Sequence, residues 1–299
     1  MTPLRILVAG RSGQVASSLA EAAGQRPGYE LTCLGRPELD ITDRQGVGAA
    51  IDAAAADIVI NAAAYTAVDQ AETEPDAARA GNEAGPRNLA EATAEKGVPL
   101  IHLSTDYVFN GEGSRPYCED DPTDPLGVYG ASKLAGERAV AAANPRHLIL
   151  RTAWVYGAYG KNFLKTMLRV AGERDELRVV ADQHGAPTSS HDIASGLLDL
   201  AGLVLEGGSG TPWGTYHMAA RGEAVWADFA DAIFEASARA GGPSASVVRI
   251  TTAEYPTPAR RPQYSVLDSS ALERSFGVRL PDWREPVGDI VARVVQDRD

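Results

Sequence analysis

A tyrosine and a lysine lie four positions apart in the segment Tyr129-Gly130-Ala131-Ser132-Lys133. On a helix, residues at this spacing share a face, because one turn takes 3.6 residues. An ammonium beside a phenol favours the phenolate and lowers the pKa of the phenol, which can then exchange a proton near neutral pH. The lysine can also hold a ribose. This pair occurs by chance in many helices, so its meaning depends on the elements that position it.

The first of these elements is a glycine turn at the start of the chain. The apolar run Arg5–Ala9 predicts a buried strand, and it leads into Gly10-Arg11-Ser12-Gly13-Gln14-Val15-Ala16 and an alanine-rich helix. Gly10 permits a tight turn, and Gly13 lets the backbone approach a pyrophosphate at the helix N-terminus. The spacing differs from the commonest Gly-x-Gly-x-x-Gly. The alternative is an ordinary strand–helix turn, which the position at the start of the chain disfavours.

Strands and helices then alternate, which is typical of an α/β fold with a doubly wound parallel sheet. The pattern becomes irregular after about residue 155, and there we expect a smaller lobe over the carboxyl ends of the strands. We therefore expect a dinucleotide-binding domain over residues 1–155, to which some later segments return, and mainly a substrate-binding lobe over 156–299. The predicted strands are Arg5–Ala9, Glu30–Leu34, Asp57–Asn61, Val98–Leu103, Arg146–Thr152, Arg178–Val180 and Thr215–Ala219. The predicted helices include Asp76–Lys96, divided at Pro86, and Asn162–Ala171, Ile193–Leu205 and Trp226–Ala238.

The loop after the second strand bears on the choice of cofactor. Arg36 follows that strand, where an enzyme for NAD would often carry an acid, and the first acids, Glu38 and Asp40, come later. Arg36, with or without Arg11, is therefore placed to meet a 2′-phosphate, which favours NADPH over NADH. A solvated surface charge is the alternative for either arginine.

Composition excludes several classes of protein. The chain has 299 residues and a formal net charge of −12, which argues against a nucleic-acid partner. No stretch is apolar for long enough to predict a membrane span, so we expect a cytoplasmic protein. The two cysteines, Cys33 and Cys118, show no zinc-ligand spacing, and the same holds for the histidines. His102 lies in an apolar run and is expected to be a core residue.

Further motifs, in order and spacing, carry a resemblance to a known family. Together with the glycine turn and the Tyr129–Lys133 pair, Asn61-Ala62-Ala63-Ala64-Tyr65-Thr66 and Ser104-Thr105-Asp106-Tyr107-Val108-Phe109 resemble an extended short-chain dehydrogenase/reductase. One branch, the dTDP-4-dehydrorhamnose reductases, is similar over nearly the whole chain. The motifs that point to it are Leu39–Asp43, Ala67-Val68-Asp69, Arg151–Tyr156, Asp182–Thr188 and Arg261–Asp268.

The resemblance implies a Rossmann-like domain for NAD(P)H, a C-terminal lobe for a dTDP-sugar, and reduction of the C4 ketone of dTDP-4-dehydro-L-rhamnose to dTDP-L-rhamnose. It makes Tyr129 the proton donor to the sugar oxygen, while Lys133 lowers the phenol pKa and holds the nicotinamide ribose. Thr105 would orient the carbonyl. The implied cofactor-binding residues, besides Tyr129 and Lys133, are Gly10, Arg11, Ser12, Gly13, Gln14, Val15, Arg36, Asp40, Ile41, Ala62, Ala63, Ala64 and Tyr65. The implied substrate residues are Thr66, Val68, Thr105, Asp106, Tyr107, Trp154 and Arg261.

The family also raises the questions of a metal and of assembly. Some members use Mg²⁺ at a dimer contact, but His191 stands just after the Pro187-Thr188 loop, where a carboxylate would be expected. We therefore assign no metal ligands, and we expect a monomer or homodimer. Two other functions remain open: a 4-ketoreductase for another dTDP-deoxysugar of antibiotic biosynthesis, and a non-catalytic NADP-binding regulatory subunit like the β subunit of methionine adenosyltransferase. The intact set of Thr105, Tyr129 and Lys133 favours an enzyme, because a binding module has no chemical need for all three.

Overall fold

The structure is a computed structural model, and it describes residues 2–297. Its main sheet has six parallel strands in the order β10-β5-β4-β3-β1-β2. The bounds of these strands are β1 Leu4–Ala9, β2 Tyr29–Leu34, β3 Ile58–Asn61, β4 Leu100–Thr105, β5 His147–Thr152 and β10 Gly214–His217. The predicted α/β class with a parallel sheet is therefore confirmed.

Helices cover both faces of this sheet, because alternate residues of the buried strands point to opposite sides. Ile6 and Val8 of β1 join a core with α1 (Gln14–Gly24), α8 (Ser190–Gly207) and α10 (Ser270–Phe276). Leu7 and Ala9 join a second core with α2 (Arg44–Ala54), α5 (Gly85–Glu95) and α6 (Val128–Ala143). Asp43 is the N-cap of α2, and its carboxylate accepts a hydrogen bond from Gln45 N at 3.1 Å.

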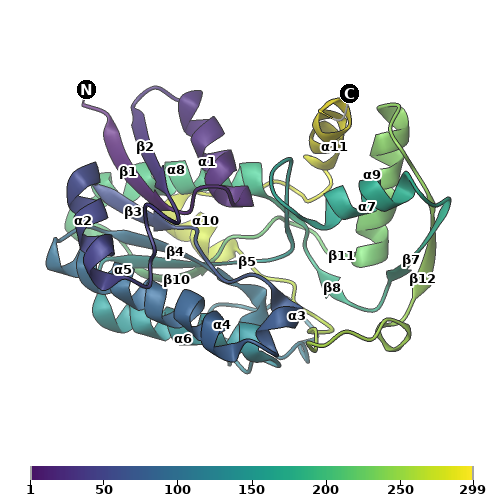
Figure 1. The fold of residues 1–299 in the computed structure, drawn as a ribbon, viewed down its shortest axis with the longest axis horizontal. Helices are drawn as coiled ribbons and strands as arrows, with labels where there is room; N and C mark the ends of the chain where they lie inside the picture. Colours follow the sequence, from purple (N-terminus) through teal and green to yellow (C-terminus); the bar gives the residue numbers. More distant parts are fainter. Residues whose placement is uncertain (1, 298–299) are drawn as a thin grey trace.

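A smaller part with its own apolar core lies beside the sheet (Figure 1). Its helices are α7 Phe163–Ala171, α9 Trp226–Arg239 and α11 Val287–Gln296. Its strands are paired two by two: β7 Glu176–Val180 with β12 Ser246–Ile250, β8 His184–Gly185 with β11 Ala224–Val225, and β6 Val155–Tyr156 with β9 Thr188–Ser189. The remaining short segments are α3 Val68–Ala71, α4 Pro75–Arg79 and the single helical turns Asp106–Val108, Gly208–Gly210 and Thr252–Glu254.

Two segments that we assigned to the smaller lobe belong to the larger part instead. The helix predicted at Ile193–Leu205 is α8, which begins earlier, at Ser190, and packs along α1. The strand predicted at Thr215–Ala219 is β10, which pairs with β5 at the edge of the main sheet. The physical reason is that β5 would otherwise expose an unpaired edge, and the apolar face of α1 needs a cover.

The helix predicted at Asp76–Lys96 is divided just before Pro86, as expected. After α4, residues Ala80–Ala84 form a π-helical turn, and α5 then starts at Gly85 with Pro86 in its first turn. A proline has no N–H to donate, so it fits the first turn of a helix and interrupts the bonding of the turn before it. No helix within residues 2–297 is long and apolar enough to cross a membrane.

Candidate active site

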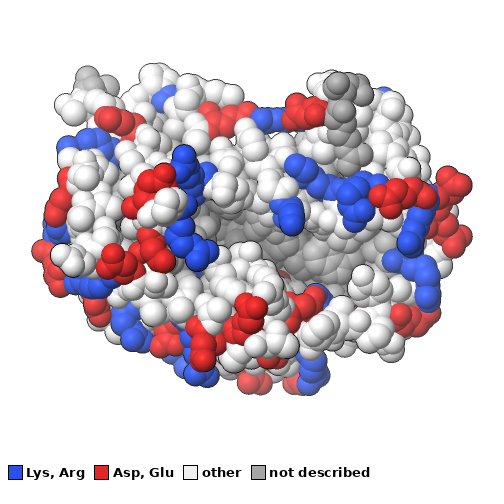
Figure 2. All heavy atoms as spheres, in the orientation of Figure 1, with Lys and Arg blue, Asp and Glu red and all other residues white. Residues whose placement is uncertain are grey.

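The predicted site residues gather at the carboxyl ends of the parallel strands, which is where ligands bind in such sheets. Thr105 ends β4, the glycine turn follows β1, and Ala62 follows β3. The molecular surface is hollowed between the larger and the smaller part, and Lys and Arg side chains gather around the hollow (Figure 2). A basic rim of this kind attracts a phosphorylated ligand even though the whole chain is acidic.

Tyr129 and Lys133 lie one turn apart on α6, as their spacing predicts. The Lys133 side chain is buried, and its ammonium donates a hydrogen bond to the carbonyl of Leu103 on β4 at 2.6 Å. Burial lowers the pKa of Lys133 to about 8, which the negative charge of Glu137 partly opposes.

The pKa of Tyr129 differs from our expectation. Burial raises it to about 12, a hydrogen bond from Thr105 opposes the rise, and the charge of Asp106 adds to it. We expected Lys133 to lower this pKa, but its ammonium is directed at the Leu103 carbonyl. The phenol is therefore protonated throughout the neutral range, which is the state that a proton donor needs.

Thr105 and Asp106 form the wall beside the phenol. The Thr105 hydroxyl donates to Asp106 Oδ1 at 2.9 Å, and both side chains are buried. Burial raises the pKa of Asp106 to about 6, against the hydroxyls of Ser265 and Thr105, which lower it. The ring of Tyr107 meets that of Tyr129 edge to face, with centroids 5.6 Å apart. The four predicted residues Thr105, Asp106, Tyr107 and Tyr129 thus lie together.

Small residues allow α6 to come this close. A Cβ on Gly130 would overlap the carbonyl oxygen of Tyr107, and one on Gly136 would overlap that of Asn82. Asn82 is fully buried and bridges the backbone, because its side chain bonds both N–H and C=O of Tyr65 at 2.8 and 3.0 Å. Asn82 is therefore a buried polar link between α6 and the segment after β3.

The glycine turn has the geometry that a close backbone approach requires. Gly10 has φ +132°, a conformation that side chains rarely adopt, and a Cβ there would lie 3.3 Å from the carbonyl carbon of Ala62. Gly13 is the N-cap of α1, and Arg11, Ser12 and Gly13 are exposed. The N–H groups at the start of this helix are therefore available to an anion.

Gln14 and Val15 turn away from this opening. The Gln14 amide donates to Val155 O at 3.2 Å, and its oxygen accepts from Asn162 at 3.0 Å, so it joins the turn to the smaller part. The Val15 side chain lies in the apolar core. Our assignment of Val15 to the cofactor can therefore concern its backbone only.

A cavity of 410 Å³ continues from Gly10 toward the second strand. Arg36 is exposed at this cavity, whereas Arg11 is held by Glu38, with 2.6 Å between its guanidinium and the carboxylate. Arg36 is thus the freer of the two arginines that we predicted to meet a 2′-phosphate. The lining residues are Gly10, Leu34, Gly35, Arg36, Leu39, Asp40, Ile41, Thr42, Ala63, Ala64, Tyr65, Ala77, Ala80 and Gly81.

A second cavity, of 310 Å³, lies in the smaller part and is aromatic and basic. Trp154 stands next to it, because its ring stacks on that of Trp226 with centroids 3.5 Å apart. Arg261 lines it and is held by Asp69 of α3, with 2.8 Å between guanidinium and carboxylate. The other lining residues are Phe163, Thr166, Met167, Arg178, Val179, Val180, Gln183, Trp226, Tyr255 and Thr257.

Among the predicted substrate residues, Thr66 and Val68 lie on the segment that leads into α3, and Thr66 is exposed.

Sequence reasoning missed Phe163, Arg178, Trp226 and Tyr255 as residues of the second cavity. No spacing links them along the chain. The one signal in the sequence was the presence of large aromatic side chains outside the predicted core, because such side chains gather on a surface mainly where they bind a partner or ligand.

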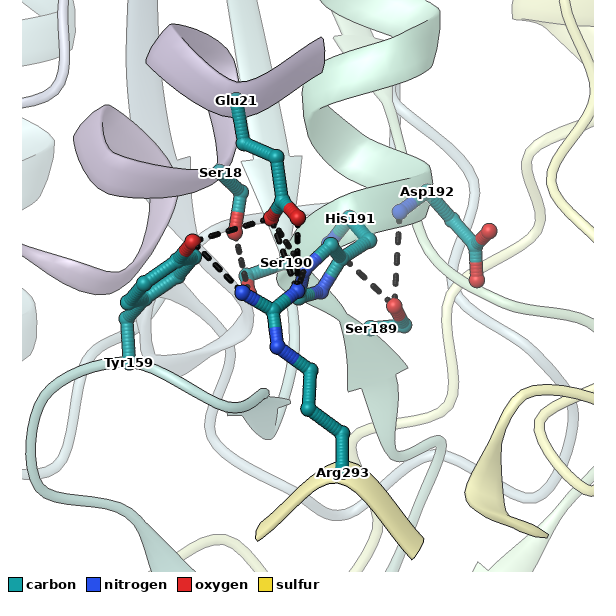
Figure 3. A network of polar contacts seen from close by, with 8 residues as sticks. All are labelled: Ser18, Glu21, Tyr159, Ser189, Ser190, His191, Asp192 and Arg293. Carbon is teal, nitrogen blue, oxygen red and sulfur yellow. Dashed lines mark hydrogen bonds and ion pairs between the residues drawn. The ribbon is translucent and has the colours of Figure 1, made fainter. Parts of the chain in front are cut away.

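The place where we expected a metal carboxylate holds an ionic cluster instead (Figure 3). The Arg293 guanidinium at the end of α11 donates to both carboxylate oxygens of Glu21 at 2.7 and 2.9 Å, and to the Tyr159 hydroxyl at 2.8 Å. His191 Nε2 lies 3.0 Å from Glu21 Oε2. Burial alone would raise the pKa of Glu21, but the hydrogen bonds of Arg293 and Tyr159 and the charge of Arg293 lower it.

This cluster does not fit Mg²⁺, which prefers several oxygen ligands. Arg293 already supplies the positive charge next to the carboxylate. Within residues 2–297, no three or more histidine, cysteine or acidic side chains are grouped so that they could hold a metal ion. The cluster also joins four segments: α1, the loop after β6, α8 and α11.

Comparison with known proteins places the chain in a family. The sequence model of the RmlD substrate binding domain matches residues 4–296. The chain is 50% identical over 297 residues to the dTDP-4-dehydrorhamnose reductase of Sinorhizobium fredii, covering 99% of this chain and all of that protein. It is 41% identical to the enzyme of that name from Escherichia coli K12, covering 94% and 95% of the two chains.

Solved structures agree with this relationship. The dTDP-4-dehydrorhamnose reductase of Bacillus anthracis, crystallised with NADP, superposes with a TM-score of 0.89 at 36% identity, over 97% of this chain and 99% of that one. The corresponding protein of Clostridium acetobutylicum gives 0.88 at 38% identity, over 96% and 98%. The family model spans nearly the whole chain, and the relatives match from end to end, so this protein belongs to the RmlD substrate binding domain family.

Proposed function

We propose that this chain is an NADPH-dependent reductase of the C4 ketone of dTDP-4-dehydro-L-rhamnose, which it converts to dTDP-L-rhamnose. The observation that carries the proposal is the presence of Thr105, Tyr129 and Lys133 together at the carboxyl ends of the strands. The names of the relatives and the NADP in the Bacillus anthracis structure support both the reaction and the cofactor.

The glycine turn and the 410 Å³ cavity fit a dinucleotide. The N–H groups at the start of α1 would hold the pyrophosphate, Asp40 and Ile41 would hold the adenosine, and Arg36 would hold the 2′-phosphate. Ala62, Ala63 and Ala64 leave space for the cofactor at the end of β3. NADH would leave Arg36 without a partner, so we assign it the weaker binding. When bound, the reduced nicotinamide supplies the hydride for the sugar carbon.

The chain's own residues complete the reduction. When the sugar binds, the Thr105 hydroxyl turns from Asp106 Oδ1 and donates a hydrogen bond to the carbonyl oxygen, which it orients toward Tyr129. As negative charge develops on that oxygen, Tyr129 gives up its phenolic proton to it. The ammonium of Lys133 holds the nicotinamide ribose. Asp106, Tyr107 and Trp154 surround the sugar ring.

The aromatic and basic cavity of the smaller part fits the thymidine diphosphate. Trp226, Phe163 and Tyr255 offer faces for the base, while Arg178 and Arg261 offer charge to the phosphates. On this proposal, the larger part holds the cofactor and the smaller part holds the nucleotide sugar. The protein acts in the cytoplasm, as a monomer or homodimer.

An assay of the purified protein tests the reaction. We expect NADPH oxidation, followed at 340 nm, when dTDP-4-dehydro-L-rhamnose is made in place by the epimerase that precedes this step, and dTDP-L-rhamnose as the product. Turnover of a 2-deoxy or 3-amino analogue in place of that sugar would assign the chain to antibiotic deoxysugars. NADPH binding without turnover of any keto sugar would indicate the regulatory subunit.

A further inference from the structure

A buried ion pair lies directly behind the candidate active site. Glu137 of α6 and Arg151 of β5 are 2.8 Å apart between carboxylate and guanidinium, and their side chains are 5% and 6% exposed. Glu137 Oε1 also accepts from the Ser104 hydroxyl at 2.5 Å and from Arg151 Nε at 3.0 Å. Both oxygens of the carboxylate therefore accept hydrogen bonds, and the donors lie on two strands, β4 and β5.

The pair is one step away from two of the three predicted catalytic residues, Thr105 and Lys133. Ser104 and Arg151 face each other in the β4–β5 register, and Thr105 follows Ser104 directly. Glu137 lies one helical turn after Lys133 on the same face of α6. The pair thus joins the helix that carries Lys133 to the strand that carries Thr105.

Stability alone gives a weak reason for such a pair. Taking two charges out of water costs about as much as their attraction returns, and an apolar replacement is often as stable. Arg151 makes two further contacts, to Glu119 O at 3.3 Å and over the ring of Phe109 at 5.2 Å, so it also fixes the loop that leads into α6.

The surroundings of Lys133 also indicate that the pair does more than stabilise the fold. The groups that face its ammonium are the Leu103 carbonyl and His102 on β4 and Glu137 on its own helix, while Arg151 on β5 faces Glu137. His102 is neutral, because burial and the Lys133 charge keep its pKa well below its ordinary value. Glu137 is therefore the negative charge that Lys133 meets.

We propose that the Glu137–Arg151 pair positions Lys133 for the reaction and supplies the negative neighbour of its buried ammonium. This inference rests on the proposed function, since it needs Lys133 to hold the cofactor or act in turnover. Glu137 and Arg151 touch neither cofactor nor sugar on this proposal, so they are positioning residues.

The test is the pH dependence of the variant Glu137→Gln, which keeps the shape of the side chain and removes its charge. Without that charge Lys133 loses its proton at lower pH, so the alkaline limb of kcat/KM should move down by at least about half a pH unit. At pH 9 we expect kcat to fall at least about threefold, with little change in the KM for the sugar. The matched control is Glu83→Gln, which removes a carboxylate from the exposed pair with Arg87 and should leave the limb where it is.

A second variant covers the risk that Arg151 without a partner prevents folding. Glu137→Gln with Arg151→Met removes both charges, and it should fold and show the same shift of the alkaline limb. An alkaline limb that coincides with that of the wild type in either folded variant refutes the proposal. If neither variant folds, the pair is structural and the positioning role is likewise refuted.

The binding of NADPH separates this proposal from the proposed function. The pH dependence of NADPH binding, followed by its fluorescence without any sugar, should shift in Glu137→Gln in the same direction as kcat/KM. A wild type that does not turn over dTDP-4-dehydro-L-rhamnose refutes the proposed function, but a shifted binding profile still supports the role of the pair. An unshifted binding profile in a protein that does turn over the sugar refutes the pair alone.

Discussion

Replacing Tyr129 by phenylalanine should remove most of the turnover and leave the protein otherwise intact. The ring remains, and with it the edge-to-face contact with Tyr107 at 5.6 Å. The lost hydroxyl has Thr105 as its hydrogen-bond partner, so the free energy of unfolding should change by about 1 kcal/mol or less. NADPH binding should stay nearly unchanged, because Lys133 and the glycine turn are untouched.

The effect on kcat follows from what the phenol supplies. Its pKa of about 12 keeps it protonated at neutral pH, so on the proposed function it can give its proton to the developing oxyanion. A positioned general acid contributes about 10²- to 10⁴-fold in rate, which corresponds to about 3–5 kcal/mol of the barrier. We therefore expect kcat to fall by at least about 100-fold with a small change in KM.

Single-turnover oxidation of NADPH at 340 nm measures this loss, and NADPH fluorescence titration measures binding. Tyr216→Phe is a suitable control, because Tyr216 lies on β10, its hydroxyl donates to the Pro212 carbonyl at 2.7 Å, and the variant should keep its activity. A Tyr129→Phe protein with kcat within about threefold of the wild type would show that another group donates the proton.

Four other perturbations have definite expected results. Arg36→Ala should raise the KM for NADPH by about tenfold or more and leave the KM for NADH unchanged, because only NADPH has a 2′-phosphate for the guanidinium; equal effects in steady-state assays with both cofactors would contradict this. Asp106→Asn should raise the free energy of unfolding at pH 7 by up to about 3 kcal/mol. The pKa of Asp106 in the folded state, about 6, lies above its ordinary value of 3.8, so the stability of the wild type falls as pH rises from 4 to 6; denaturant unfolding across that window should lose this slope in the variant. EDTA and added Mg²⁺ should leave the activity unchanged, because Arg293 takes the place of a cation beside Glu21. Activity that EDTA abolishes would refute the conclusion that this cluster holds no metal. Arg293→Met should lower the free energy of unfolding by about 1 kcal/mol, measured by thermal melting.

Much of the sheet was predictable because its signals are local. A buried parallel strand is a short apolar run, and the glycine turn after β1 is written in consecutive residues. The spacing of Tyr129 and Lys133 also fixed their common face on α6. The positions of α8 and β10 could not be predicted from local patterns, because the open edge of β5 and the apolar face of α1 decide where those segments pack.

The active site likewise has some features that the sequence predicted and others that it did not. Thr105, Asp106 and Tyr107 were assigned to the site because they belong to a motif that resembles the family's, at the carboxyl end of a strand. The direction of the pKa shift of Tyr129 was predicted wrongly, because the pKa of a phenol depends on its burial and on the direction of the neighbouring ammonium. Sequence spacing contains neither quantity.

The sequence by itself determined the class of fold, the order of the motifs at the strand ends and the catalytic candidates. These follow from the spacing of apolar residues, glycines and polar side chains within short stretches of the chain. Only the tertiary structure decided which distant groups meet. Arg293 lies 272 positions from Glu21, and Glu137 needs strands β4 and β5 for its partners. Such contacts arise when packed elements bring charges together out of water, and there each buried charge must find a partner.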